Sequence, residues 1–540
     1  MTDYNFETLV KADGGNVKLG ASLTFMNSTE SVFRYPAAFK NRVPYPHVIL
    51  EDVFDDVFLR ECLDELKTSM AANFKETDLF KVYQTADLAN LEICVNETAR
   101  VRNLLRLRDF LYSSNFREFV EATAGCDGLD GVVDCSCNLY TPSCHLLCHD
   151  DVIGKRKISY VIYLTDPDEE WLESDGGQLE LYGLDSDMVS PHSKPEISIL
   201  PKWNSMIMFQ VLPGQSFHAV REVRSQAKTR VSISGWFHTM SESDIDSARK
   251  SLSTLQQLRA RSSNSVQNIQ MERMFSSVVH DMHIHLNSLS RWINPEYLSQ
   301  DGMEKVRQYF AEQKSVQLLD FMLPNIANEL KTKIEREECR NRRESQFYEY
   351  GIGLGWKVQG PPQLCRYLKY EPSSSNVFFE RSKLGDLLEN IKNEVFSSEA
   401  FAVWIQKITG SSCQLYHSEV RRFRPGFDYT LAHDSRHGQN EIHVNACFTD
   451  GTKRSWDSGD IGGYTCFMQT GEDNEIGADV YEDENMNDGL QSVSASFNGL
   501  SIVHLSNDVT NFVKYVSAFA PRSRWDIVSR LQIVYANDQI

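Results

Sequence analysis

Three short segments between residues 135 and 237 determine how this chain can be interpreted: His149-Asp150-Asp151, Gln215-Ser216-Phe217-His218-Ala219-Val220 and Arg230-Val231-Ser232-Ile233-Ser234-Gly235-Trp236-Phe237. The last segment alternates apolar and polar side chains, and an apolar run at 205–209 precedes the second. Alternation with a period of two is typical of a strand that is buried on one face. We therefore expect the residues of these segments to lie among short, packed strands.

The spacing of His149, Asp151 and His218 is that of a metal site. Residues two apart on a strand point to the same side of the sheet, so His149 and Asp151 are predicted to leave the end of one strand together. His218 is then expected to complete the site from another part of the chain. Two imidazoles and one carboxylate hold one face of an octahedral Fe(II) in non-haem oxygenases and leave three positions open.

Arg230 helps to choose between two kinds of metal site. Two histidines and a carboxylate also form hydrolytic zinc sites, and a bare His-x-Asp occurs by chance in many chains. The planar guanidinium of Arg230 can bind a carboxylate through two parallel hydrogen bonds. We therefore favour an iron oxygenase that uses an oxo acid with a distal carboxylate. Asp150 is expected to point away from its two neighbours and is not assigned as a ligand.

The set Tyr140, His149-Asp150-Asp151, Tyr163, His218 and Arg230 resembles the double-stranded β-helix core of the prolyl hydroxylase branch of the 2-oxoglutarate oxygenases. From about residue 45 to the C-terminus, the chain resembles a two-domain family, that of 2-oxoglutarate and iron-dependent oxygenase domain-containing protein one and the yeast termination and polyadenylation protein. The resemblance implies that His149, Asp151 and His218 bind the metal. It also implies that Arg230 and Tyr163 bind the oxo acid, and that the three ligands and Arg230 are the catalytic residues.

This resemblance implies a specific activity. The enzyme is expected to use Fe(II), 2-oxoglutarate and dioxygen, with ascorbate as reductant, to hydroxylate a prolyl residue. The expected substrate is a small-subunit ribosomal protein at the decoding centre, hydroxylated at the 3-position, with an effect on translation. The resemblance also suggests that the protein works in the cytoplasm and the nucleus.

The charge of the chain limits its partners. Its formal net charge is −20, whereas binding to nucleic-acid phosphates requires a basic surface. We therefore expect no direct nucleic-acid partner, and an acidic enzyme attracts a basic polypeptide such as a ribosomal protein. Two alternatives stay open: a 2-oxoglutarate oxygenase acting on another protein or on nucleic acid, and a non-enzymatic adaptor.

Composition also bears on the compartment. No run approaches the roughly 18–20 apolar residues of a membrane-spanning helix, and the start of the chain lacks the basic and apolar regions of a secretory signal. We therefore expect no membrane partner. The 12 cysteines form no CxxC pair, so they are expected to be reduced thiols of an intracellular protein.

A chain of 540 residues is too long for one hydrophobic core. We predict a catalytic domain at 1–240, a linker at 241–275 that is rich in Ser, Gln, Arg and Asp, and a second domain at 276–540 with a helical lead-in. In the first domain, residues 45–54 are predicted to form a strand, and residues from about 55 to 70 an amphipathic helix. Further strands are expected at 157–164 and 177–182.

An internal repeat supports two similar domains. His433-Asp434-Ser435, Phe448-Thr449-Asp450 and Gly462-Gly463 parallel His149-Asp150-Asp151, Leu164-Thr165-Asp166 and Gly176-Gly177, and each first histidine lies 17 residues before its Asp. The expected fold is mainly β with flanking helices (α+β). It consists of two tandem double-stranded β-helix, or jelly-roll, domains, of which the second is degenerate.

The second copy lacks the chemistry of the first. Ser435 stands in place of Asp151, Cys447 in place of Tyr163, and no histidine occurs around residues 512–516. The second domain is therefore predicted to be non-catalytic, with a scaffolding or substrate-docking role. Its acidic loop at 472–489 contains no Lys or Arg; it is interpreted either as a docking strip for a basic protein or, more commonly for such loops, as a solvated segment.

Overall fold

The computed structural model of the chain describes residues 17–18, 39–91, 98–240, 272–273, 287–340, 347–372, 380–432, 440–450, 453–469, 491–506 and 509–533. The chain divides into two compact units, one comprising chiefly Met1–Gln257 and the other most of the remainder. The predicted acidic loop at 472–489 lies outside the described residues, as does the predicted linker at 241–275 apart from residues 272–273. The exact domain boundaries stay a prediction.

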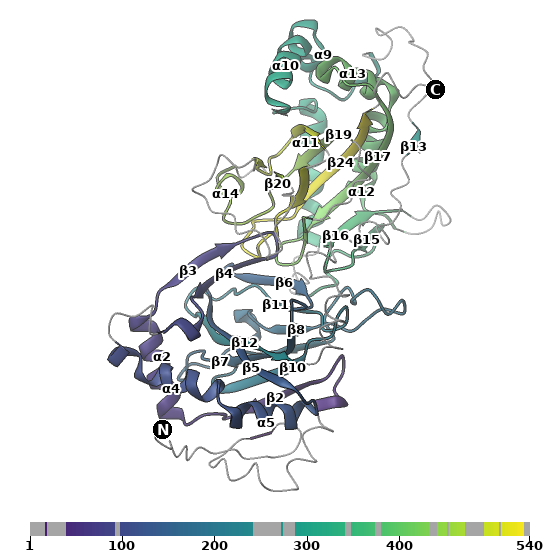
Figure 1. Cartoon of the computed structure of the whole chain (residues 1–540). Helices are drawn as coiled ribbons and strands as arrows, with labels where there is room; N and C mark the ends of the chain where they lie inside the picture. Colours follow the sequence, from purple (N-terminus) through teal and green to yellow (C-terminus); the bar gives the residue numbers. More distant parts are fainter. Residues whose placement is uncertain are drawn as a thin grey trace. The chain divides into compact units, whose positions relative to one another are not determined.

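The first unit is built on one curled sheet (Figure 1). Its strands follow the order β1-β2-β10-β7-β12-β5-β4-β6-β11-β8-β9, and β3 pairs with β4. All of these pairings except β1 with β2 are antiparallel. The strands span Val17–Lys18 (β1), His47–Glu51 (β2), Ala72–Glu76 (β3), Phe80–Thr85 (β4), Leu129–Tyr140 (β5), His145–His149 (β6), Arg156–Tyr163 (β7), Leu179–Leu181 (β8), Ile197–Ile199 (β9), Ser205–Gln210 (β10), His218–Val220 (β11) and Arg230–Thr239 (β12).

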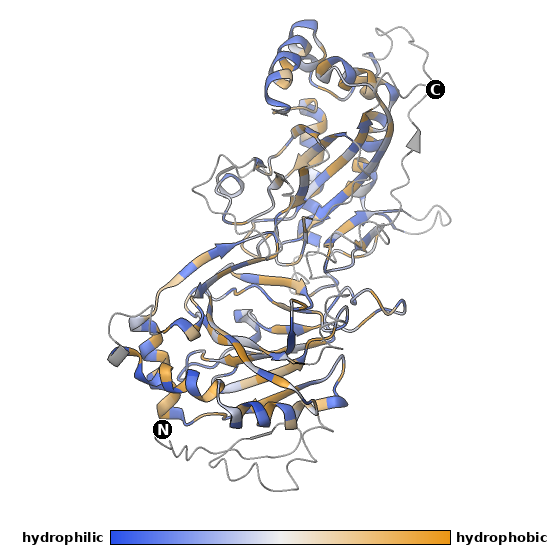
Figure 2. Ribbon diagram, viewed as in Figure 1, coloured by the Kyte–Doolittle hydropathy of each residue, from blue (hydrophilic) through white to orange (hydrophobic). Residues whose placement is uncertain are grey.

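The two faces of this sheet have different roles. Along β7, Ile158, Tyr160 and Ile162 belong to a core that packs on helices, whereas Tyr163 belongs to a separate cluster on the other face. The helices are α2 (Asp56–Ser69), α4 (Arg102–Leu111) and α5 (Ser114–Ala124). Figure 2 shows apolar stretches along the strands and helices that carry both apolar and polar residues. One face is thus closed by helices, and the inner face is left to form the site.

Helix α2 illustrates how the sequence specifies its own boundaries. The Asp55 side chain accepts a hydrogen bond from the backbone N–H of Phe58 at 2.9 Å and caps the first turn. Leu59, Cys62, Leu63 and Leu66 are buried at the spacing of one helical face. The helix predicted from about 55 to 70 is confirmed, and the strand predicted at 45–54 is shorter, namely β2.

The second unit has a nine-stranded sheet that includes the order β14-β22-β19-β24-β17-β16-β15, and a three-stranded sheet β21-β20-β23. Its strands span Glu272–Arg273 (β13), Ser315–Leu318 (β14), Trp356–Gln359 (β15), Cys365–Tyr370 (β16), Cys413–Phe423 (β17), Tyr429–Thr430 (β18), Glu441–Phe448 (β19), Thr465–Gln469 (β20), Gln491–Val493 (β21), Gly499–Leu505 (β22), Val509–Val513 (β23) and Arg524–Ile533 (β24). Its helices are Pro295–Leu298 (α9), Gln300–Gln313 (α10), Pro324–Arg340 (α11), Lys383–Ile391 (α12), Glu399–Thr409 (α13) and Lys453–Asp457 (α14).

The two sheets share their central order. The series β2-β10-β7-β12-β5 in the first unit corresponds to β14-β22-β19-β24-β17 in the second. The register agrees as well: Arg230 pairs with Tyr140, and Arg524 pairs with Phe423. The predicted fold, mainly β with flanking helices and two tandem jelly-roll domains, is therefore confirmed.

The repeated Gly-Gly pair shows the same correspondence in the backbone. Gly176 and Gly177 have φ values of 75° and 71°, and Gly462 and Gly463 have 67° and 72°. L-residues other than glycine rarely adopt such angles. A Cβ atom would also collide with a backbone carbonyl oxygen, that of Glu222 at Gly176 and that of Tyr515 at Gly462. Both units therefore require glycine at the same bend.

Candidate metal centre

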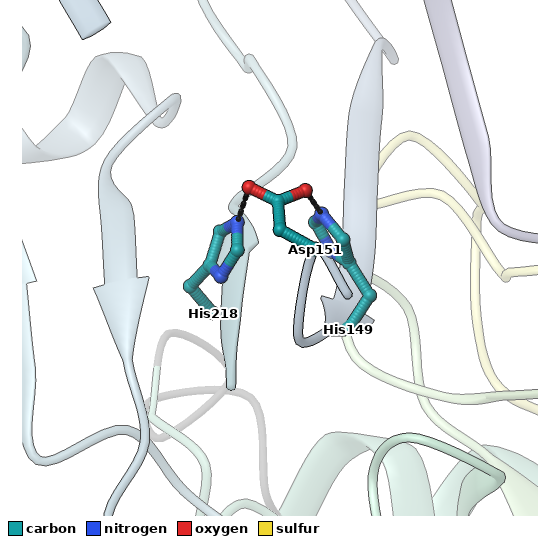
Figure 3. Close-up of side chains that lie close together, drawn as sticks. All are labelled: His149, Asp151 and His218. Atoms are coloured by element: carbon teal, nitrogen blue, oxygen red, sulfur yellow. Dashed lines mark hydrogen bonds and ion pairs between the residues drawn. The ribbon is translucent and has the colours of Figure 1, made fainter. Parts of the chain in front are cut away.

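The structure brings His149, Asp151 and His218 together in the first unit (Figure 3). His149 Nε2 lies 3.1 Å from Asp151 Oδ1, and His218 Nε2 lies 3.3 Å from Asp151 Oδ2. All three side chains are buried, with exposed fractions of 7%, 6% and 4%. Within the described residues, this is the single group of three His, Cys, Asp or Glu side chains close enough to share a metal ion.

Strand pairing and a turn position the three ligands. His149 ends β6, His218 begins β11, and these two residues are direct partners across the strands. Asp151 has φ of 61°, which is left-handed backbone and not strand. The expectation that strand alternation aligns His149 with Asp151 is therefore wrong. A turn after β6 brings the carboxylate back over the imidazole, and Asn and Asp are among the residues that tolerate this conformation.

Backbone carbonyls fix the orientation of both imidazoles. His149 Nδ1 lies 2.8 Å from the Leu147 carbonyl oxygen, and His218 Nδ1 lies 2.8 Å from the Ser216 carbonyl oxygen. When Nδ1 carries the proton and donates to the carbonyl, Nε2 is free to bind a metal. Both Nε2 atoms face Asp151 (Figure 3). The rings are therefore held in the orientation that a metal site needs.

The electrostatics of the metal centre favour the charged forms of Asp151 and His149. Burial opposes the ionised Asp151, but the nearby His218 charge and hydrogen bonds from both imidazoles bring its pKa well below the usual value. Burial would lower the pKa of His149, yet its hydrogen bond to Asp151 and the charge of that carboxylate raise it overall. A buried anion that faces two imidazoles is a site for a cation, which takes the place of the imidazole protons.

Asp150 has a structural role between the ligand-bearing segments. Its carboxylate accepts hydrogen bonds from the backbone N–H of Val152 at 3.3 Å and of Gly214 at 3.0 Å. Its carbonyl oxygen accepts from the Ser216 hydroxyl at 3.0 Å. Asp150 is not a member of the cluster formed by His149, Asp151 and His218. It connects the turn that carries Asp151 to the loop that leads to His218.

Arg230 and Tyr163 form a second polar group on the inner face. Arg230 Nε donates to the Gly177 carbonyl oxygen at 2.8 Å, and Nη1 donates to the Ser232 hydroxyl at 3.1 Å. The guanidinium carbon lies 5.1 Å from the centre of the Tyr163 ring and 4.9 Å from that of Tyr140. Burial raises the pKa of Tyr163, although the charge on Arg230 partly opposes this. The tyrosine is therefore a neutral hydrogen-bond donor.

These two residues fit a bound carboxylate. Among the residues that the structure describes, no atom lies within hydrogen-bonding geometry of the buried Tyr163 hydroxyl. In the same part of the chain, no carboxylate forms an ion pair with Arg230. A buried guanidinium without a counter-ion beside an unsatisfied hydroxyl is costly unless an anion binds there. The distal carboxylate of 2-oxoglutarate meets this requirement. The individual roles given to Arg230 and Tyr163 stay predictions.

Two neighbours of Asp151 were not predicted from the sequence. The Ser159 hydroxyl and the Trp236 indole N–H both donate to Asp151 Oδ2. The spacing could have indicated Trp236. It lies six residues after Arg230 on the same predicted strand, and an even spacing places both side chains on one face of the sheet. Its contact with Asp151 depends on the turn at Asp151, and that turn was not predicted.

The second unit replaces the polar group of Arg230 with an internal ion pair. By strand register, Arg524 corresponds to Arg230, Cys447 to Tyr163 and Asp526 to Ser232. Asp526 Oδ2 accepts from Arg524 at 2.9 Å, and its carboxylate accepts two hydrogen bonds from Arg421 at 2.8 and 2.9 Å. Burial raises the pKa of Asp526, but the two guanidinium charges outweigh burial and lower it. His433 and Ser435 lie outside the described residues.

Two family models match the chain. The model described as 2OG-Fe(II) oxygenase superfamily matches residues 135–238, the segment that carries the metal cluster and Arg230. The model described as oxoglutarate and iron-dependent oxygenase degradation C-term matches residues 284–539. One match thus falls in each unit of the structure.

Curated relatives match over nearly the whole length. The chain is 52% identical over 496 residues to prolyl 3,4-dihydroxylase OGFOD1 of Ostreococcus tauri, covering 90% of this chain and 95% of the relative. It is 26% identical to prolyl 3-hydroxylase OGFOD1 of Xenopus laevis, covering 88% and 84%. A solved prolyl-4-hydroxylase from Pseudomonas putida is 20% identical, covers 36% of this chain and 93% of its own, and has a TM-score of 0.27.

In the described part of the chain, the helices are all too short or too polar to cross a bilayer.

Proposed function

The chain belongs to the OGFOD1 family of iron- and 2-oxoglutarate-dependent prolyl hydroxylases, and we propose that its substrate is a prolyl residue of a basic protein in the small ribosomal subunit. The enzyme is a 2-oxoglutarate-dependent prolyl hydroxylase, and its cofactors are Fe(II), 2-oxoglutarate and dioxygen. The predicted resemblance is therefore confirmed. The observation that carries the function is the buried cluster of His149, Asp151 and His218.

The polar residues of the first unit would have two separate roles, metal binding and cosubstrate binding. When bound, Fe(II) with 2-oxoglutarate and dioxygen supplies the oxidising power that inserts one oxygen atom into a prolyl C–H bond, with succinate and carbon dioxide as by-products. His149, Asp151 and His218 would hold the metal through one face. Arg230 and Tyr163 would hold the distal carboxylate of the cosubstrate and fix its orientation. The buried surroundings exclude water from these polar groups.

The net charge supports the basic substrate. A chain with a net charge of −20 attracts a basic polypeptide through its overall field. We place the substrate proline at the decoding centre, with hydroxylation at the 3-position and an effect on translation. Ascorbate is the proposed reductant, and cytoplasm and nucleus are the proposed compartments. These assignments follow from the family resemblance. For the second unit, we propose a non-catalytic role in substrate docking.

The test begins with an anaerobic titration of the full chain with Fe(II) and 2-oxoglutarate, followed through the metal-to-ligand charge-transfer band. Oxygen is then admitted together with a peptide from the decoding-centre loop of the small-subunit protein, and the peptide is weighed. A band and a gain of one oxygen atom support the proposal, provided that a proline-to-alanine peptide gains nothing. A band with an unchanged peptide would overturn the ribosomal substrate but keep the oxygenase.

A further inference from the structure

The two oxygen atoms of Asp151 have different surroundings. Oδ2 accepts a hydrogen bond from the Trp236 indole N–H at 2.9 Å and another from the Ser159 hydroxyl at 3.1 Å. Each oxygen also faces one ligand imidazole: Oδ2 lies 3.3 Å from His218 Nε2, and Oδ1 lies 3.1 Å from His149 Nε2. A carboxylate oxygen offers about two lone-pair sites, so two donors that are not metal ligands engage those of Oδ2. Oδ1 keeps its lone pairs for a cation.

The two donors are held rigidly by the sheet. Ser159 on β7 and Trp236 on β12 are direct partners across adjacent antiparallel strands. The Arg156 guanidinium carbon lies 3.4 Å from the centre of the Trp236 ring, and Arg156 Nε lies 3.8 Å from Asp134 Oδ2. The cation stacked on one side fixes the plane of the indole. The N–H of Trp236 is therefore aimed at Asp151 before any metal binds.

We propose that Ser159 and Trp236 are positioning residues that keep Asp151 bound to iron through one oxygen only. Three single-atom protein ligands leave three of six positions, which are the two that the oxo acid needs and the one that dioxygen needs. If both carboxylate oxygens bound the metal, the third position would be filled. The proposal rests on the iron-dependent hydroxylation stated above, but not on the identity of the protein substrate.

Three variants test this proposal in the full chain: Trp236→Phe, Ser159→Ala and the double variant. The phenyl ring of Trp236→Phe still stacks on Arg156 but has no N–H to donate to Asp151. We expect 2-oxoglutarate still to produce its charge-transfer band, because two positions remain for it. The rate at which the band decays on admission of oxygen should fall about 10–100-fold, the usual range for losing an outer-shell partner. The visible spectrum of the Co(II)-substituted double variant should report a higher coordination number than that of the parent protein.

Two controls separate positioning from packing. Ser159→Thr keeps the hydroxyl and should restore the parent oxygen reactivity. Trp203→Phe removes an indole N–H that donates to the exposed Asp56 carboxylate at 2.8 Å, and it should leave the Co(II) spectrum unchanged. If Trp236→Phe does not fold, the comparison of Ser159→Ala with Ser159→Thr decides the matter.

Parent-like oxygen reactivity and Co(II) spectra in Ser159→Ala and in any folded Trp236 variant would overturn the proposal. So would a uniform loss of 2-oxoglutarate binding in these variants, because that result indicates disrupted packing. The absence of a charge-transfer band in the parent protein itself is a different result. It would refute the function and not the positioning role alone.

Discussion

Arg524 and Asp526 form a buried ion pair, with 2.9 Å between Nη2 and Oδ2, at the two positions where the first unit has Arg230 and Ser232. One protein thus contains two versions of the same sheet. In the first, the guanidinium lacks a carboxylate partner among the described residues; in the second, a carboxylate of the chain takes that place. This difference, together with the metal cluster of the first unit, leads to the following predictions.

Replacing Asp526 with Ser, the residue of the first unit, should destabilise the second unit. The variant removes the carboxylate that accepts hydrogen bonds from both Arg421 and Arg524 in a buried place, and such losses cost about 3–5 kcal/mol. Urea unfolding of the full chain measures the change. Asp457→Ser, at an exposed position, is the control and should change stability by no more than about 0.5 kcal/mol. A loss below about 1 kcal/mol in Asp526→Ser would contradict the importance of the pair.

Replacing Tyr163 with Phe should weaken binding of the cosubstrate without destabilising the protein. No hydrogen bond within normal geometry is found for this hydroxyl among the described residues, so its removal should cost the fold little. A hydrogen bond to a charged group contributes about 1.5–3 kcal/mol. We expect the KM for 2-oxoglutarate to rise roughly 10–100-fold. Tyr160→Phe, on the same strand but the opposite face, loses a bond to the Asp134 carbonyl oxygen and should show the reverse pattern. Equal KM values in both variants would refute the role of Tyr163.

Replacing His218 with Ala should abolish hydroxylation, because it removes one of three metal ligands. Metal affinity should fall more than about 100-fold, which exceeds the usual effect of losing an outer-shell partner. Equilibrium dialysis with Fe(II) and mass analysis of the peptide measure both effects. His433→Ala, in the second copy of the sequence motif, should leave turnover nearly intact. A folded His433→Ala protein without activity would show that the second unit takes part in the reaction.

His443 should make the second unit sensitive to acid. Burial lowers the pKa of this imidazole to about 3, and the charges of Arg421 and Arg530 act in the same direction. The unfolded chain takes up a proton below about pH 6.5, so this contribution to stability is complete above pH 6.5. It is lost as the pH falls towards 3, at up to about 1.4 kcal/mol per pH unit.

The test compares urea unfolding between pH 7.5 and pH 5 for the parent and for His443→Gln. The variant cannot titrate, so its unfolding free energy should depend less on pH. An unchanged slope in His443→Gln would show that other groups cause the acid sensitivity.

The sequence predicted much of the fold because the strands that matter are either continuous apolar runs or alternate between apolar and polar residues. The runs at 157–164, 205–209 and 230–237 became β7, β10 and β12. It also predicted which ligands meet, because two histidines, a carboxylate and an arginine in this order are rarely found together for another reason. The backbone at Asp151 could not be predicted, since a left-handed residue after a strand leaves no mark in residue spacing.

The ion pairs that Asp526 forms in the second unit could not be predicted from the sequence either. The sequence shows that Ser435 and Cys447 have replaced polar groups of the first copy, but not that Asp526 neutralises Arg421 and Arg524. That contact depends on the register between β17 and β24, which is set by the whole sheet. Likewise, the partnership of Ser159 and Trp236 requires the exact pairing of β7 with β12.

Arg230, which has no carboxylate partner among the described residues, distinguishes the first unit from the second. A fold that binds an anion at a buried, unpaired guanidinium gains stability from that anion, by about 2.7 kcal/mol at a concentration one hundred times the dissociation constant. In the second unit, the Asp526 carboxylate already pairs with Arg524. If Arg230 binds the carboxylate of 2-oxoglutarate as proposed, the heat resistance of the first unit should rise with the concentration of this metabolite. In a cell short of 2-oxoglutarate, the hydroxylase would lose not only its turnover but also part of its resistance to unfolding and degradation.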